Sequence, residues 1–205
     1  MSIEHVKKIS YYYGKNEKKA SQITKISAEG AVLPRGRILI MLDKLVEDSE
    51  FIYPYYRFQE EGYSVDVVAS KANETYVGKH GVPFTSNFSP DKVKIDDYDG
   101  LIIPGGRAPD YMRTDKGLVN IVQEAFLKGK IVAAICHGPQ MLIEANVLRG
   151  RRVTCWKSVV TDVKNAGAVF LDEAAVVDGN MVTSRSPADL PEFCKKTIRL
   201  LPKIR

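Results

Sequence analysis

The sequence predicts an α/β fold, a three-layer sandwich in which helices cover both faces of a mainly parallel central sheet. Two observations lead to this prediction. Short continuous apolar runs, the pattern of strands buried on both faces of a parallel sheet, recur along the chain. Segments with helical propensity separate these runs, and an alternation of strands and helices is typical of parallel sheets.

A boundary at Pro34-Arg-Gly36 divides the 205 residues into an N-terminal extension, residues 1–36, and one α/β domain over 37–205. The extension is polar, and its three adjacent tyrosines at 11–13 leave open a flexible tail or an arm that packs on a neighbouring subunit. It also carries most of the net charge of +5, so the domain is near neutral. We therefore expect no nucleic-acid-binding face on the domain.

The first half of the domain contains one complete strand–helix–strand unit, and Gly62 marks the end of its helix. A polar, turn-rich excursion with short strands is expected at 71–98 before the next buried strand. The elements predicted in this half are strands over 37–42, 64–69 and 99–103 and a helix over 50–61.

The second half continues the alternation and closes with a hairpin and a helix. Asp178-Gly-Asn180 lies between two short apolar runs and predicts the hairpin turn. The elements predicted in this half are helices over 117–127, 140–145 and 188–200 and strands over 131–135, 152–155, 174–177 and 181–184.

The candidate nucleophile is Cys136, at the end of the apolar run 131–135. A helix follows at once, and Pro139 fits its first turn, so the thiol lies at a sharp strand-to-helix corner of the kind called a nucleophile elbow. Backbone N–H groups at the start of a helix favour negative charge, lower a thiol pKa and hold an oxyanion. The alternative is a cysteine that packs as a small hydrophobic residue.

Other candidates follow the remaining strands of the sheet. Ligands bind at the carboxyl ends of parallel strands, so Glu47, Glu50 and the turn of Gly105 and Gly106 should converge on Cys136. A carboxyl beside a thiol can hold or deliver a proton, although acids also favour the first turn of a helix. Either glycine is a candidate oxyanion donor, because glycine lets the backbone approach closely.

His137 is the candidate base, with His80 as the alternative. Consecutive side chains on a helix diverge by about 100°, so Cys136 and His137 face each other only if the elbow relaxes this geometry. His80 lies in a turn between two glycines, where a histidine is more often merely solvated.

The elbow sequence Ile135-Cys-His-Gly-Pro-Gln140 closely resembles that of the PfpI intracellular proteases, members of the ThiJ/PfpI superfamily. Val46–Pro54 resembles the family segment FEDxExIYP, and Pro104–Asp110 resembles PGGRAPE. The resemblance covers about residues 37–200 and implies a flavodoxin-like, class I glutamine amidotransferase-like fold. In this alignment Glu50 matches the glutamate that contacts the thiol, and Glu47 matches its companion.

The resemblance also implies that His137 joins the active site and that the chain forms a homo-oligomer, a dimer or a trimer of dimers. In the PfpI proteases an acid at the position of Asp110 completes a Cys-His-acid triad from the adjacent subunit. The family has glutamate there, and the shorter aspartate weakens the triad inference. Ser186 replaces a frequent histidine, and Trp156 replaces a smaller aromatic residue or threonine, so both should alter the pocket.

We therefore expect a cytoplasmic, cysteine-dependent PfpI-like hydrolase, an intracellular peptidase that needs neither cofactor nor metal. One alternative is a glyoxalase III or protein deglycase, in which the thiol adds to a reactive aldehyde such as methylglyoxal. Another is a redox or stress sensor, or a chaperone, in which Cys136 is oxidised. No apolar run reaches the roughly 20 residues of a membrane span, so we expect no membrane partner. Cys155 and Cys194 are expected to be packing residues.

Overall fold

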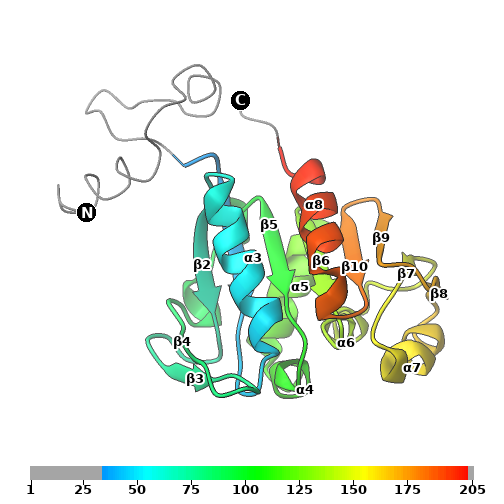
Figure 1. Cartoon of the computed structure of the whole chain (residues 1–205), viewed down its shortest axis with the longest axis horizontal. Helices are drawn as coiled ribbons and strands as arrows, with labels where there is room; N and C mark the ends of the chain where they lie inside the picture. Colours follow the sequence, from blue (N-terminus) through cyan, green and yellow to red (C-terminus); the bar gives the residue numbers. More distant parts are fainter. Residues whose placement is uncertain (1–33, 203–205) are drawn as a thin grey trace.

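The computed structural model describes residues 34–202, and in it six strands form one central sheet (Figure 1). Neighbouring strands pair in parallel, except that the last strand of the sheet is antiparallel to its neighbour. In order across the sheet the strands are β2 (Ser64–Val68), β1 (Arg37–Met41), β5 (Gly100–Ile103), β6 (Ile131–Ile135), β10 (Met181–Ser184) and β9 (Ala175–Asp178).

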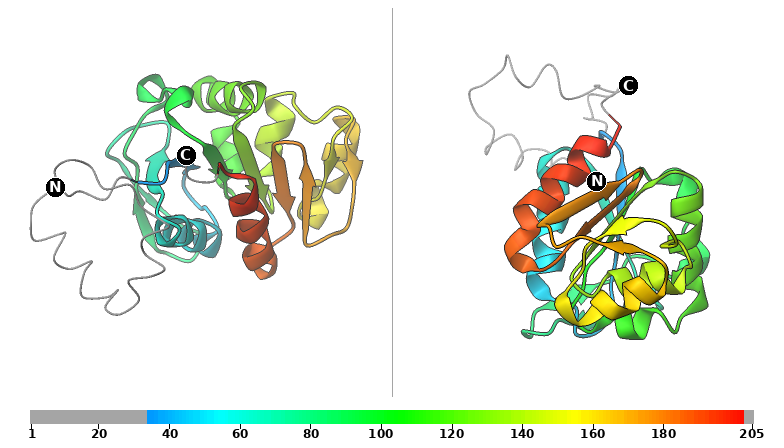
Figure 2. Two further views of the ribbon diagram at one scale, coloured as in Figure 1. Left: turned by 90° about the horizontal axis from the view of Figure 1, so that it is seen from above. Right: turned by 90° about the vertical axis from the view of Figure 1, so that its right-hand side faces the viewer.

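Helices cover both faces of this sheet, as the two views of Figure 2 show. On one face, α3 (Asp48–Glu60) packs against α8 (Leu190–Leu200). On the other, α5 (Lys116–Leu127) packs against α6 (Pro139–Glu144). Two shorter helices, α4 (Ala108–Met112) and α7 (Val160–Asn165), lie next to α6. The predicted three-layer, mainly parallel α/β sandwich is confirmed.

The two central strands are buried along their whole length. Every residue of β5 and of β6 is buried, which explains why both read as continuous apolar runs rather than alternating ones. Helix α5 begins at Asp115, whose side chain accepts hydrogen bonds from the N–H groups of Gly117 and Leu118. Local capping and strand burial thus agree with the sheet that the sequence predicts.

Two small strand pairs flank the main sheet. The excursion expected at 71–98 contains an antiparallel pair, β3 (Thr75–Val77) and β4 (Pro83–Thr85). The strand predicted over 152–155 is shorter than expected: β7 (Arg152–Val153) pairs with β8 (Val169–Phe170), outside the main sheet. This strand ends because the Thr154 N–H donates to the Thr183 hydroxyl instead of a backbone carbonyl.

The sequence did not predict α4, α7 or β8. Each is six residues or fewer, which is too short for a hydrophobic period to appear. Helix α3 begins two residues earlier than predicted, with Asp48 and Glu50 in its first turn. Most of the predicted N-terminal extension, including the tyrosines at 11–13, lies outside the described residues.

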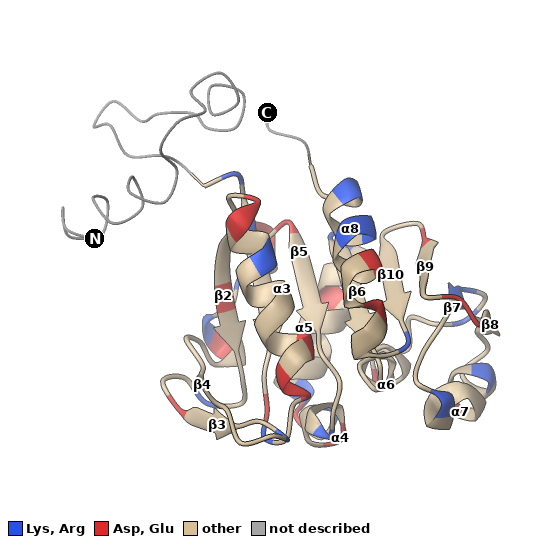
Figure 3. Cartoon of the chain, in the orientation of Figure 1, with Lys and Arg blue, Asp and Glu red and all other residues tan. Residues whose placement is uncertain are grey.

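Two further properties concern the surface of the described part. Figure 3 shows both basic and acidic residues along α3 and along α8, so neither helix presents a face of one sign. Within residues 34–202, no helix is long and apolar enough to cross a membrane.

Candidate active site

The site is built on the corner between β6 and α6, at the carboxyl end of the sheet. Cys136 has a φ of 63°, in the left-handed region that a residue with a side chain rarely adopts. Its N–H donates to the Ser184 carbonyl at 3.0 Å, so the strand pairing continues up to the thiol. A Cβ at Gly138 would collide with the Ile103 carbonyl, so this position requires glycine. The elbow predicted from the sequence is therefore present.

Two other loops are tied together beside this corner. The Arg107 N–H donates to the Leu45 carbonyl at 2.8 Å, and the Glu47 N–H donates to the Gly105 carbonyl at 3.3 Å. Gly106 has a φ of 72°, and a Cβ there would collide with the backbone of Leu45 and Glu47. The loops after β1 and β5 thus form one surface that faces the thiol.

Glu50 lies at the bottom of the site and contacts the thiol. Its side chain is 0% exposed, and Oε2 accepts the Gly105 N–H at 2.8 Å. Oε1 is buried and has no hydrogen-bond partner within the described residues, and the nearby Cys136 thiol lowers the pKa of the carboxyl. The structure therefore brings together the two residues that the resemblance pairs.

Burial changes the proton affinity of both groups. It raises the pKa of Glu50 from its ordinary value of 4.5 to about 7, against the opposing effects of the Gly105 N–H and the Cys136 thiol. Burial, reinforced by the Glu50 charge, raises the pKa of Cys136 to about 12. The pair thus loses one proton near neutral pH and keeps the second. The lowered thiol pKa expected from the elbow is wrong, because burial and a neighbouring carboxylate outweigh the helix N-terminus.

Backbone donors nevertheless point at the sulfur. The backbone N–H groups of Gly106 and His137 both lower the pKa of Cys136. The sequence left open whether Gly105 or Gly106 stabilises an oxyanion. The Gly105 N–H is committed to Glu50, so Gly106 and the elbow are the available donors.

His137 faces the thiol in spite of its adjacent position in the sequence. Nδ1 lies 3.3 Å from Cys136 Sγ, because the left-handed backbone at Cys136 turns the two side chains toward each other. Nε2 lies 3.2 Å from the hydroxyl of Ser158. Burial and the charge of Lys79 lower the pKa of His137 from 6.5, while Asp110 acts in the opposite direction. The imidazole is therefore neutral at pH 7.

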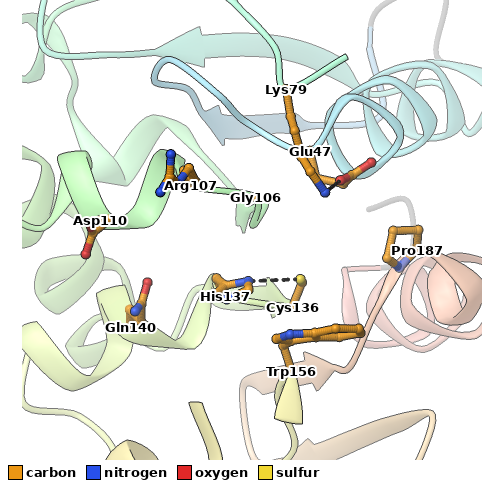
Figure 4. A pocket seen from close by; sticks show the side chains of 10 residues that line it. All are labelled: Glu47, Lys79, Gly106, Arg107, Asp110, Cys136, His137, Gln140, Trp156 and Pro187. Atoms are coloured by element: carbon orange, nitrogen blue, oxygen red, sulfur yellow. Dashed lines mark hydrogen bonds and ion pairs between the residues drawn. The ribbon is translucent and has the colours of Figure 1, made fainter. Parts of the chain in front are cut away.

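A cavity of about 540 Å³ opens above Cys136 and His137 (Figure 4). The Trp156 ring forms part of its wall, with its centroid 6.4 Å from that of His137. Asp110 lines the same cavity of its own chain, where no hydrogen bond joins it to His137 within the described residues. The complete lining is Glu47, Lys79, Gly106, Arg107, Asp110, Cys136, His137, Gln140, Trp156 and Pro187.

Glu47 forms a charged rim with two residues of the β3–β4 hairpin. Lys79 Nζ lies 3.1 Å from its Oε2, and His80 Nε2 lies 3.2 Å from its Oε1. His80, the alternative base, thus contacts Glu47 and does not line the cavity. Lys79 does line the cavity. Nothing in the sequence marks it as a site residue except its position next to His80.

Several site residues could not be predicted from the sequence. Ser158 and Gln140 have no motif of their own, and Pro187, rather than the neighbouring Ser186, reaches the cavity. Cys155 and Cys194 are buried, as expected of packing residues, and burial raises the pKa of each thiol to about 12. No group of three or more histidine, cysteine or acidic side chains in residues 34–202 could hold a metal ion.

Comparison with known proteins identifies relatives of this chain. The family model described as the DJ-1/PfpI family matches residues 36–200. A deglycase of Pyrococcus horikoshii is 44% identical over 165 residues, which are 80% of this chain and 99% of that protein. Protein/nucleic acid deglycase 2 of Escherichia coli is also 44% identical, over 80% of this chain and 97% of its own length.

A solved structure shows the same fold. It is a two-domain protein from Anabaena variabilis, with a DJ-1/ThiJ/PfpI-like and a ferritin-like domain. It is 42% identical, with a TM-score of 0.79, and the match covers 83% of this chain and 51% of that one. The fold is therefore shared with a protein of similar sequence.

Proposed function

The chain belongs to the DJ-1/PfpI family, and on that basis we propose that it is a cysteine-dependent enzyme of the deglycase type. Its substrates are reactive 2-oxoaldehydes such as methylglyoxal and the adducts that they form with amines and thiols. The observation that carries the proposal is the fully buried Glu50 beside Cys136. A thiol and a carboxyl that together hold one proton at neutral pH suit addition to an aldehyde.

The chemistry begins at the sulfur. Sγ forms a bond to the aldehyde carbon, the thiol proton passes to the carbonyl oxygen, and a hemithioacetal results. With an amine adduct, Sγ displaces the amine, which leaves with a proton. The proton on that carbon then moves to the neighbouring ketone carbon, and the hydroxyl proton moves to the ketone oxygen, which gives a thioester of a 2-hydroxy acid. Water hydrolyses the thioester, so methylglyoxal and water yield lactate and the free thiol.

Each proton transfer has a group within reach. The pKa of Cys136, about 12, includes repulsion from the Glu50 carboxylate. When Glu50 carries the shared proton, this repulsion disappears while the Gly106 and His137 N–H donors remain, so a thiolate becomes accessible. The pKa of Glu50, about 7, matches that of a group that exchanges protons near neutrality.

The peptidase expectation has less support. Peptide hydrolysis needs an acid that protonates a leaving amine, and in a Cys-His-acid triad a carboxylate orients the histidine. Here the far nitrogen of His137 meets Ser158, and the relatives cited above are named deglycases. The cross-subunit role of Asp110 implied by the resemblance stays a prediction, as does the homo-oligomer.

The test is turnover by the purified full-length protein. Lactate formation from methylglyoxal, and release of amine from a methylglyoxal-treated lysine derivative, are measured beside cleavage of an unstructured peptide. We expect turnover of both aldehyde substrates, and its loss in Cys136→Ala. Glu50→Gln should lower the rate by at least about 100-fold, the usual contribution of a general acid–base group.

Cys194→Ala is the matched control, because it removes a buried thiol from α8, outside the site. It should keep the wild-type rate once its folding is verified. Peptide cleavage without aldehyde turnover would reverse the assignment, and full activity in Cys136→Ala would exclude the mechanism.

A further inference from the structure

The imidazole of His137 is held on two sides, and its second partner is a hydroxyl. Nδ1 lies 3.3 Å from Cys136 Sγ, and Nε2 lies 3.2 Å from Ser158 Oγ. Ser158 belongs to the short 3-10 turn Lys157–Val159, directly after Trp156. The Trp156 N–H donates to the Cys136 carbonyl at 2.9 Å. This bond ties the turn that carries the hydroxyl to the elbow that carries the thiol.

A hydroxyl at this place acts differently from a carboxylate. A carboxylate only accepts, so it fixes the proton on the far nitrogen and raises the histidine pKa. A serine hydroxyl both accepts and donates, so Ser158 can bond Nε2 whether or not that nitrogen carries a proton. Nδ1 of His137 can therefore change from acceptor to donor toward the sulfur without loss of the ring's anchor.

The charged groups around the ring are consistent with a neutral imidazole. Burial lowers the pKa of His137 most, Lys79 lowers it further, and Asp110 opposes them. Within residues 34–202, neither ring nitrogen hydrogen-bonds a carboxylate. Ser158 itself does not line the cavity, so it reaches the reaction only through His137.

We propose that Ser158 is a positioning residue of His137, bonded to the ring nitrogen that faces away from the thiol. It keeps the imidazole oriented, so that His137 can pass a proton to and from Cys136 or a substrate bound to it. This role rests on the proposed function, which needs proton transfer at the sulfur. The ring geometry on which it depends can be measured without turnover.

The experiment compares Ser158→Ala, Ser158→Thr and Ser158→Asp in the full chain. The ring resonances of His137 are titrated by NMR, which is practical because the chain has only three histidines. Alkylation of Cys136 by iodoacetamide is followed over the same pH range. Ser158→Asp should raise the pKa of His137 by about 1 pH unit or more and move the step in the alkylation profile with it.

Activity adds a second readout. Ser158→Ala should lower kcat for methylglyoxal about two- to tenfold at unchanged KM, the factor expected from one hydrogen bond of ordinary strength. Ser158→Thr should restore it, because it keeps the hydroxyl. Ser89→Ala is the matched control, because it removes a serine hydroxyl that forms an exposed hydrogen bond next to another 3-10 turn. It should leave both profiles unchanged.

A wild-type His137 pKa and alkylation profile in both Ser158→Ala and Ser158→Asp would overturn the proposal. A fall in thermal stability without a change in either profile would also overturn it, because it would assign Ser158 a structural role only. Absence of aldehyde turnover in the wild-type protein would contradict the proposed function, and the NMR titration would still decide the role of Ser158.

Discussion

Glu50→Gln should change the pH dependence of stability in a defined direction. The folded-state pKa of Glu50, about 7, lies above its ordinary value of 4.5. A carboxyl of this kind stabilises the fold fully below pH 4.5, and the contribution is lost as the pH rises to about 7. At about 1.4 kcal/mol per tenfold change in proton affinity, the loss amounts to about 3 kcal/mol. A neutral glutamine of similar shape does not undergo this loss.

The assay is urea denaturation at pH 5 and at pH 8. The upper value lies below the ordinary pKa of a thiol, so that titration of cysteine contributes little to the change. Relative to wild type, Glu50→Gln should gain about 2.5 kcal/mol in free energy of unfolding between the two pH values, because part of the loss has already occurred at pH 5. Glu60→Gln, at the exposed end of the same helix, controls for the substitution itself. If wild type and Glu50→Gln change in parallel, Glu50 is not the buried titrating carboxyl on which the site depends.

Three further predictions concern the walls of the site. In Gly105→Ala, the new Cβ would lie 2.7 Å from Glu50 Oε2 and 2.8 Å from Cys136 Cβ. The free energy of unfolding should therefore fall by about 1–3 kcal/mol, and the alkylation of Cys136 should change. Unaltered stability and alkylation would contradict this contact. Lys79→Met should raise the pKa of His137 in an NMR titration, because Lys79 lowers it; an unchanged titration would place the ammonium away from the ring. Trp156→Phe should favour phenylglyoxal over methylglyoxal in kcat/KM, because the indole forms part of the cavity wall; an unchanged ratio would show that Trp156 does not limit substrate size.

The layers of the fold could be predicted from the sequence because strands that are buried on both faces consist of consecutive apolar residues. The runs ending at Ile103 and Ile135 are of this kind, and both form fully buried central strands. Helix α4 could not be predicted because it has five residues. The break of the strand after Val153 depends on the Thr183 hydroxyl, 29 residues away, which no local pattern reveals.

The same distinction applies to the site. Cys136 and Glu50 could be predicted because strand ends converge at one edge of a parallel sheet and because their segments resemble a family. The contact between Cys136 and His137 depends on a backbone angle of 63°, and Ser158 reaches the ring from 21 residues further along the chain. The high pKa of the Cys136 thiol was missed because it results from burial, which depends on packing. The elbow motif indicates only the backbone N–H groups that lower a thiol pKa.

The most direct test of the central claim is to identify the atom that holds the substrate. Wild-type protein is quenched with acid during turnover of methylglyoxal and digested, and peptide masses are compared with those of Cys136→Ala treated alike. We predict that the peptide containing Cys136 gains the mass of one methylglyoxal, and that Glu50→Gln, with slower proton transfer, accumulates more of this adduct. Steady lactate production by Cys136→Ala, or an adduct on other residues only, would contradict the account.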